Sequence, residues 1–266
     1  MKSLKLVLGT VRSKSPILFT IAMFHFIGAL VCIGGLLIDE RSLMGVNVWL
    51  KPLKFSISVG IYILTVGFLN TLYPFSNLKR NIINNIVSFT LLLEVGIICF
   101  QGARGVQSHY NESSLFDGIL FGIMGLLIAI NVLVMVFLAF ETIRLKMKVP
   151  RPIQWAILMG WLVIIFGSWI GGQMISAMAH NVGIADGGAG LPFVNWSTEA
   201  GDLRVAHFFG LHAIQIIPLF ALWVSNKWKI NTTSKTVVTI IFGLLYFGWI
   251  AYTFYQAKQG MPFIGA

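Results

Sequence analysis

Apolar segments of about 20 residues are the feature that most constrains this chain. Seven of them follow one another, separated by short polar stretches. Only helices and closed barrels satisfy their backbone groups in lipid, and barrel strands would alternate over about ten residues instead. We therefore predict an all-α integral membrane protein, a bundle of seven transmembrane helices forming a single membrane domain over residues 1–266. The predicted spans are 16–38, 52–74, 82–101, 115–141, 153–177, 203–226 and 236–258.

Charge is scarce along the chain and concentrated at the ends of these spans. Only 11% of residues are charged and 57% are hydrophobic, whereas a soluble domain carries roughly a quarter charged residues. The net charge of +10 is typical of nucleic-acid binding, but basic residues at span ends are what orients a membrane protein. We expect the lipid bilayer as the main partner and no nucleic acid.

Orientation follows from the distribution of basic residues. Thirteen of the 19 Lys and Arg residues fall on the side that carries the N-terminus. The positive-inside rule makes that side cytoplasmic. We predict a cytoplasmic N-terminus and an extracytoplasmic C-terminus. The compact chain without long polar tails favours a prokaryotic cytoplasmic membrane over an organelle.

Glu94 is the strongest single pointer to function. It lies inside an otherwise apolar stretch of the third span, and ionisable groups in such places normally face the interior of the bundle. Gln101 follows seven residues later on the same helical face, and Arg104 lies at the outer end. The pattern predicts a catalytic or proton-carrying role for Glu94. A structural polar clamp between helices is the alternative.

The sixth span gathers polar residues on one side. At about 100° per residue, Arg204, His207, His212 and Gln215 occupy a single face, and the opposite face is apolar. Asp202, just before this span, is predicted to be its N-cap. Snorkelling to the membrane surface is the alternative explanation for Arg204, as it is for Arg104.

Two histidines and a carboxylate fall at similar depth. At about 1.5 Å per residue, His25 on the first span, Glu94 and His212 all lie near the middle of the membrane. If spans one, three and six touch, they form a buried site in a cavity that opens outward. Imidazoles on separate helices are what a b-type haem or a transition metal requires as ligands. The residues predicted to bind such a cofactor are His25, Gln101, Arg104, Arg204, His212 and Gln215.

His180 and His207 lie nearer the outer surface. Imidazole is a general transition-metal ligand, so a separate metal site at these two residues is predicted there. The glycine-rich stretch 183–190 between them is a candidate lid over a pocket. An ordinary connector is the alternative.

Several functions remain open at this stage. The leading hypothesis is a haem- or metal-binding membrane redox protein. One alternative is a proton-coupled transporter or channel for a small polar or anionic solute, and another is a metal-dependent enzyme acting on a lipid-like substrate. An accessory subunit that binds another membrane chain is also compatible with the pattern. The sequence does not decide whether the chain is an enzyme.

Close packing of helices is suggested at two places. Gly118-x-x-x-Gly122 and Gly167-x-x-x-Gly171 match the small-residue pattern that lets membrane helices approach each other. The two cysteines, Cys32 and Cys99, both fall inside apolar segments and provide no disulfide framework.

Overall fold

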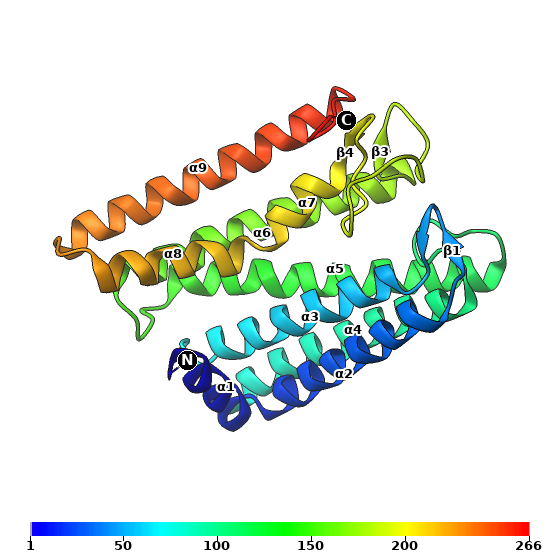
Figure 1. Cartoon of the computed structure of the whole chain (residues 1–266). Coiled ribbons are helices and arrows are strands. Elements are labelled where there is room, and N and C mark those ends of the chain that lie inside the picture. Colours follow the sequence, from blue (N-terminus) through cyan, green and yellow to red (C-terminus); the bar gives the residue numbers. More distant parts are fainter. Residues whose placement is uncertain (1, 266) are drawn as a thin grey trace. The chain divides into compact units, whose positions relative to one another are not determined.

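The computed structural model describes residues 2–265, which are helical almost throughout (Figure 1). Contacts along the chain define two compact units, unit 1 (Met1–Val134) and unit 2 (Met135–Ala266). The division falls inside one long helix, α5 (Leu115–Arg144). Each unit has its own interior and is described by itself.

Unit 1 contains four helices and the first part of α5. They begin with a short amphipathic helix and are joined by tight turns. Pro16 starts the second helix, where its missing N–H costs nothing, and Gly105 ends the fourth with φ +75°. The elements are α1 (Lys2–Lys14), α2 (Pro16–Ile38), β1 (Ser42–Leu43), β2 (Val46–Asn47), α3 (Leu50–Leu69) and α4 (Asn77–Arg104).

Unit 2 contains the end of α5 and four further helices. Asn231 caps the last of these by accepting a hydrogen bond from the backbone N–H of Ser234. A long connector, residues 178–202, carries two short strands that pair with each other. The elements are α6 (Arg151–Ala177), β3 (Asn181–Val182), β4 (Gly201–Asp202), α7 (Leu203–Leu211), α8 (Ala213–Lys227) and α9 (Thr232–Lys258).

Among residues 2–265, six helices are long and apolar enough to cross a membrane: α2, α3, α4, α5, α6 and α9. The pair α7 and α8, bent by 49°, supplies a seventh if it counts as one span. The chain is therefore a polytopic membrane protein, as predicted. The predicted spans match these helices in order, with ends that differ by up to five residues.

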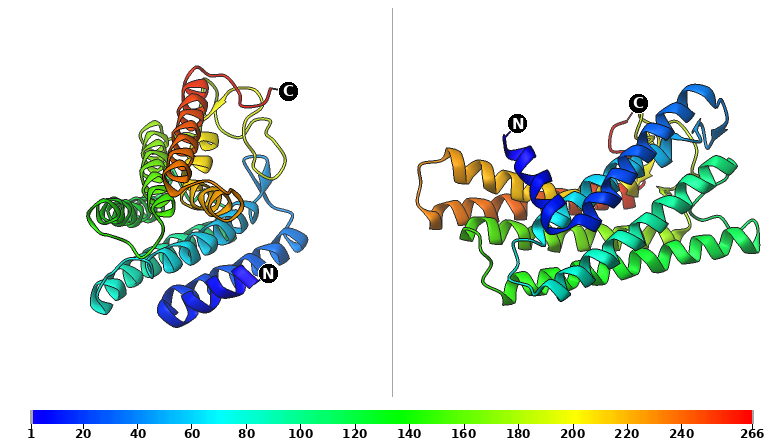
Figure 2. Two further views of the ribbon diagram at one scale, coloured as in Figure 1. Left: turned by 90° about the vertical axis from the view of Figure 1, so that its left-hand side faces the viewer. Right: turned by 90° about the horizontal axis from the view of Figure 1, so that it is seen from below.

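Helices α2, α3 and α4 pack against one another in unit 1 and run side by side in both views of Figure 2. Small residues set their register. Gly28 of α2 faces Ser56 of α3, and Gly60 of α3 faces His25 and Phe26 of α2. These contacts require α2 and α3 to run antiparallel.

The contacts between α3 and α4 are equally definite. Near one end Gly102 lies against Pro52, and near the other the Asn70 side chain donates to Asn84 Oδ1 at 2.7 Å. Helix α4 is thus antiparallel to α3 and parallel to α2. Equal numbers of residues along α2 and α4 therefore correspond to equal distances along the unit.

Helix α6 is the centre of unit 2, because α7, α8 and α9 all pack against it. Gly167 of α6 lies directly against Gly210 of α7, backbone to backbone. Gly171 faces the ring of His207. The small-residue pattern predicted at 167 and 171 is therefore a real packing site. The similar pattern at Gly118 and Gly122 is not, since a methyl group added at either would meet no described atom within 4 Å.

A polar cluster closes the turn between α2 and α3. The Arg41 guanidinium donates to Asp39 Oδ2 at 2.6 Å, and the Trp49 indole donates to the same oxygen at 2.8 Å. Together these hydrogen bonds hold the pKa of Asp39 well below its usual range. The hydrogen bond to the Asp39 carboxylate in turn raises the pKa of Arg41. The turn is thus fixed by charge at the end of two apolar helices.

Two features of the helices differ from expectation. The basic N-terminal segment forms its own helix, α1, which docks through the fully buried Val11 against Gly67 at the end of α3. The sixth span is broken at His212, so its residues do not share one straight helical face. Pro218, inside α8, has no N–H to donate to the carbonyl oxygen of Ile214, one turn before it.

Candidate functional site

Glu94 and His25 are buried inside unit 1. Each is only 3% exposed. Glu94 Oε2 and His25 Nε2 have no hydrogen-bond partner among the residues that the structure describes. An unpartnered buried polar atom costs about 1–3 kcal/mol. Other such atoms in unit 1 belong to serine and asparagine side chains, so Glu94 and His25 are the ones among them that can gain or lose a proton.

The two side chains lie at nearly the same level of the unit. Cys32 of α2 and Cys99 of α4 are in contact, which fixes the register of these parallel helices. His25 is seven residues from Cys32, and Glu94 is five residues from Cys99, in the same direction. At about 1.5 Å per residue, their levels differ by only about 3 Å.

A lysine reaches toward this region from the end of α3. The ammonium of Lys51 lies 5.9 Å from the centre of the Phe55 ring, one turn further along the helix. Its charge also acts on Glu94. A basic group thus approaches the buried carboxyl group from one end of the unit.

The predicted residues Gln101 and Arg104 both bind a carboxylate of the chain. Arg104 Nη1 donates to Asp117 Oδ1 at 2.5 Å, and Gln101 Nε2 donates to the same oxygen at 2.8 Å. Ser114 donates to the other carboxylate oxygen at 2.6 Å. This network joins the end of α4 to the start of α5. Binding of a cofactor or an anion by Arg104 stays a prediction.

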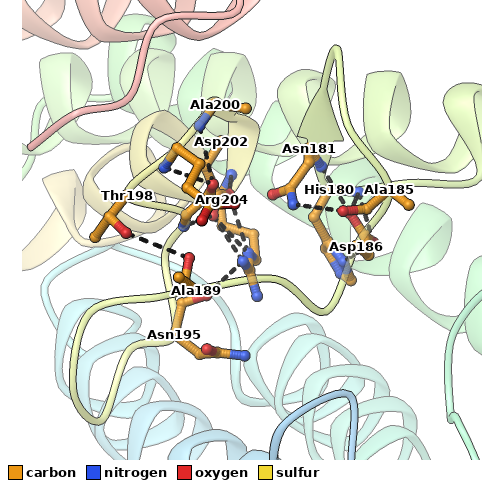
Figure 3. A network of polar contacts seen from close by, with 12 residues as sticks. His180, Asn181, Ala185, Asp186, Ala189, Asn195, Thr198, Ala200, Asp202 and Arg204 are labelled. Atoms are coloured by element: carbon orange, nitrogen blue, oxygen red, sulfur yellow. Dashed lines mark hydrogen bonds and ion pairs between the residues drawn. The ribbon is translucent and has the colours of Figure 1, made fainter. Parts of the chain in front are cut away.

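Arg204 is held in the same way in unit 2. Its Nη2 donates to Asp202 Oδ2 at 2.6 Å and to the carbonyl oxygen of Asn195 at 2.5 Å. Asp202 also caps α7, as predicted, by accepting the backbone N–H of Arg204. Figure 3 shows how the Arg204 side chain ties the connector to the start of α7. Its predicted role toward a ligand is untested.

His180 forms a second ion pair in this connector (Figure 3). Its Nδ1 lies 2.5 Å from Asp186 Oδ2, and the same carboxylate accepts the backbone N–H groups of His180 and Asn181. Burial alone raises the pKa of Asp186, but these hydrogen bonds outweigh it and lower the pKa to about 2. The carboxylate therefore orients the imidazole through Nδ1, as it does for many metal-binding or catalytic histidines.

His207 is wedged between α7 and α6. Its Nδ1 donates to the carbonyl oxygen of Gly167 at 2.8 Å, and its ring lies against Gly171. His180 and His212 belong to the same unit and both lie within electrostatic range of it. Within residues 2–265, however, no three His, Cys, Asp or Glu side chains are grouped so as to hold a metal ion. The metal site at His180 and His207 stays a prediction.

His212 occupies the break between α7 and α8. Its Nδ1 donates to the carbonyl oxygen of Phe208 at 2.6 Å, and its ring stacks on Phe208 with centroids 4.2 Å apart. Nearby, the Tyr246 hydroxyl of α9 donates to the carbonyl oxygen of Phe209 at 2.8 Å. Side chains thus satisfy carbonyl groups at the break. Gln215 lies beyond it, on α8.

The predicted site residues fall into two sets. His25, Glu94, Gln101 and Arg104 belong to unit 1. Arg204, His180, His207, His212 and Gln215 belong to unit 2. Each set contains buried polar contacts within its own unit, and the meeting of the first, third and sixth spans stays a prediction.

The chain matches no protein-family model, no curated protein and no solved structure. Its function is therefore argued from the geometry of its own residues.

The sequence identified several site residues but not the residues that bind them. Asp117 binds Gln101 and Arg104, and Asp186 binds His180. Tyr246 donates to the carbonyl oxygen of Phe209 near the end of α7. The only early signal was the spacing of Ser114 and Asp117 at a helix start, which is typical of a cap. The carboxylate that pairs with an arginine or histidine is chosen by the folded chain, since several acidic residues lie at comparable sequence distance.

Proposed function

We propose that the chain is a proton-coupled membrane transporter for a small polar or anionic solute, in which Glu94 binds the proton. The observation that carries this is the buried Glu94 carboxyl group, whose Oε2 has no partner among the described residues. An isolated carboxylate is costly in a medium of low dielectric constant, and binding a proton removes that cost. Such a group is suited to pick up and release a proton as its surroundings change.

Two further observations favour transport. His25, a second group that can exchange protons, lies at nearly the same level in the same unit. In unit 2 the bent pair α7 and α8 is interrupted at His212. Many carriers bind solute or ions at helices that are interrupted within the membrane.

The first test concerns the proton. We expect the infrared spectrum of the purified protein at neutral pH to contain the carbonyl band of a protonated carboxylic acid, and this band to be absent from Glu94→Gln. Glu112→Gln is the matched control, because Glu112 is an exposed carboxylate of the same unit. A spectrum that Glu94→Gln leaves unchanged would refute proton binding at Glu94.

The second test concerns the solute. Proteoliposomes that contain a pH-sensitive dye are given lactate, succinate, glutamate or phosphate in turn. We expect one of these to drive proton uptake by the wild type, and uptake by Glu94→Gln to fall by roughly 100-fold. If the infrared band is present and no solute moves protons, the proton site stands and the transport proposal is wrong.

A haem- or metal-binding redox protein is the second candidate, favoured by the hydrogen bond of His212. Because Nδ1 donates to Phe208, Nε2 is the ring atom left in the right tautomer to bind a metal ion. His25 Nε2 is buried and unpartnered among the described residues. Each of these imidazole nitrogens could bind a haem iron or a transition metal ion.

Absorption spectroscopy decides this candidate. A haem protein purified in mild detergent shows a Soret band that shifts with dithionite and is lost in His25→Ala and His212→Ala. His109→Ala serves as the control, because His109 packs among aromatic rings outside the helices. A colourless protein that contains no transition metal would eliminate the redox candidate.

A further inference from the structure

The two cysteines of the chain meet inside unit 1. Cys32 of α2 and Cys99 of α4 are both free thiols. Their side chains lie close to each other and to Ser56 of α3, whose Oγ has no hydrogen-bond partner among the described residues. Three helices thus contribute one polar side chain each to a single point. The sequence placed both cysteines in apolar spans and gave no reason to pair them.

The surroundings of this pair are apolar and closed toward the turn between α2 and α3. Ala29, Leu36 and Leu53 pack around Cys32, and Trp49 packs on the same cluster. The Trp49 ring lies against Gly35, three residues beyond Cys32, and is held there by its hydrogen bond to Asp39. Cys32 itself is only 1% exposed.

One side of the pair is more open. Cys99 is half-buried, and Phe100 beside it is exposed on a helix that crosses the membrane. Both cysteines lie about 8–9 Å inside the ends of their helices. A molecule dissolved in the lipid can therefore approach Cys99 from the flank, whereas the Trp49 cluster separates the thiols from the aqueous end.

We propose that Cys32 and Cys99 form a reversible dithiol–disulfide couple that exchanges two electrons with a lipid-soluble quinone. The Cys99 sulfur adds to the quinone ring and forms a carbon–sulfur bond. The Cys32 sulfur then attacks the Cys99 sulfur, the carbon–sulfur bond breaks, and its electron pair stays on the ring. The thiols are oxidised to one disulfide, and the quinone, with the two thiol protons, becomes the quinol.

This couple would link α2 covalently to α4 when it is oxidised. A disulfide requires Cα atoms within about 7 Å of each other, and α2 and α4 pack directly against each other. The unpartnered Ser56 Oγ can accept a hydrogen bond from the S–H group of either thiol and so orient the attacking sulfur. The couple is independent of the proposed proton site at Glu94, which lies more than a turn away on α4.

The test uses the whole protein in membrane vesicles. Vesicles are treated with a short-chain quinone or with oxidised glutathione, which is charged and stays in water. The protein is then denatured and its free thiols are reacted with a polyethylene-glycol maleimide. Because the chain has two cysteines, the gel shift counts the thiols that remain.

We expect the reduced wild type to show two additions and the quinone-treated protein none, with both restored by dithiothreitol. Oxidised glutathione should leave both additions in place over the same time. Cys99→Ala is the control and should keep its single addition after quinone treatment. In Cys32→Ala the quinone adds to Cys99 and no second thiol releases it, so the single addition should be lost and the protein should gain the mass of one quinone. The reacted wild type should stay monomeric on a non-reducing gel.

Three results would overturn the proposal. Two additions after quinone treatment would mean that no disulfide forms. Loss of the single addition in Cys99→Ala would mean that the quinone modifies Cys32 without any pairing of the two thiols. Equal oxidation by glutathione would place the thiols in contact with water and remove the argument for a lipid-soluble partner.

Discussion

Two arginine–aspartate pairs of similar geometry differ in their surroundings. The Asp202 side chain is fully buried, and Arg204 is its charged partner. Arg41 is half exposed beside Asp39 in the turn between α2 and α3. Each guanidinium approaches its carboxylate to 2.6 Å. The two pairs therefore share this distance and differ in burial, so comparing them shows how burial affects the contribution of an ion pair to stability.

Replacement of Arg204 should lower the stability of the protein much more than replacement of Arg41. Arg204→Gln leaves a buried carboxylate without its counter-ion, and we expect a loss of about 3 kcal/mol of stability. Arg41→Gln should lower the stability far less, since water screens the exposed pair. Thermal unfolding in detergent, followed by tryptophan fluorescence, measures both. Equal shifts of Tm in the two variants would contradict this assignment.

The connector of unit 2 should depend on pH through Asp186. Its pKa falls from an ordinary 3.8 to about 2 in the folded chain, so its contribution to stability is complete above about pH 4 and is lost as the pH falls toward 2. We expect pepsin to cut the connector at Leu191 or Phe193 only near the lower end of this range.

Asp186→Asn supplies the comparison, since the amide cannot form the ion pair with His180. The connector of this variant should be cut by pepsin already at pH 4. Mass spectrometry of the fragments identifies the site of cleavage. Cleavage of both proteins with the same pH profile would mean that this carboxylate does not hold the connector.

At the scale of single residues, the sequence identified which groups are unusual. Glu94 stood out because a carboxylate in an apolar span is costly anywhere in the membrane, whatever the fold. It could not reveal that Arg104 and Arg204 pair with Asp117 and Asp202. Those pairs depend on side-chain directions at helix ends, which hydropathy does not encode.

At the scale of helices, α6 and α7 can approach each other closely because glycine, which has no side chain, occupies both sides of their contact at Gly167 and Gly210. A methyl group added to Gly167 would lie 2.8 Å from the backbone of Gly210. We expect Gly167→Ala to force the helices apart and cost about 1–3 kcal/mol. Gly172→Ala on the same helix should cost nothing, because a methyl group there meets no described atom within 4 Å.

Thermal unfolding in detergent compares the two glycine variants. The expected result is a lower Tm for Gly167→Ala alone. A Tm for Gly167→Ala equal to that of Gly172→Ala would mean that the two helices can separate without loss, contrary to the close approach of Gly167 and Gly210.

Helix boundaries and the break in the sixth span show what a run of apolar residues can and cannot predict. A run of apolar residues predicts that a helix crosses the membrane, and it did so for all six unbroken spans. The same run gave no warning at His212, because the residues on both sides continue the apolar pattern. Pro218 was a visible signal, but prolines are tolerated in membrane helices and do not by themselves locate a break.

At the scale of the whole molecule, the number of crossings determines where the chain ends. With seven crossings the termini lie on opposite sides of the membrane, and with six they lie on the same side. The basic residues predict a cytoplasmic N-terminus. The bent pair α7 and α8 is the one element on which the count depends.

Reporter fusions in a bacterial host test both points. We expect alkaline phosphatase to be active, and green fluorescent protein to be dark, when fused after residue 266. The reverse is expected for fusions in the turn between α8 and α9, near Lys229. Active phosphatase at both positions would mean that α9 does not separate them. Fluorescence at both would place the C-terminus in the cytoplasm.

The sequence alone determined that this is a polytopic membrane protein, where its six unbroken spans run, and which polar groups are costly in an apolar span. These follow from the transfer of each residue between water and lipid, a local property that needs no knowledge of neighbours. Only the tertiary structure decided that Cys32 meets Cys99, that Asp186 orients His180, and that a helix breaks at His212. Each of these is a choice of partner, which depends on register and side-chain direction rather than on hydropathy.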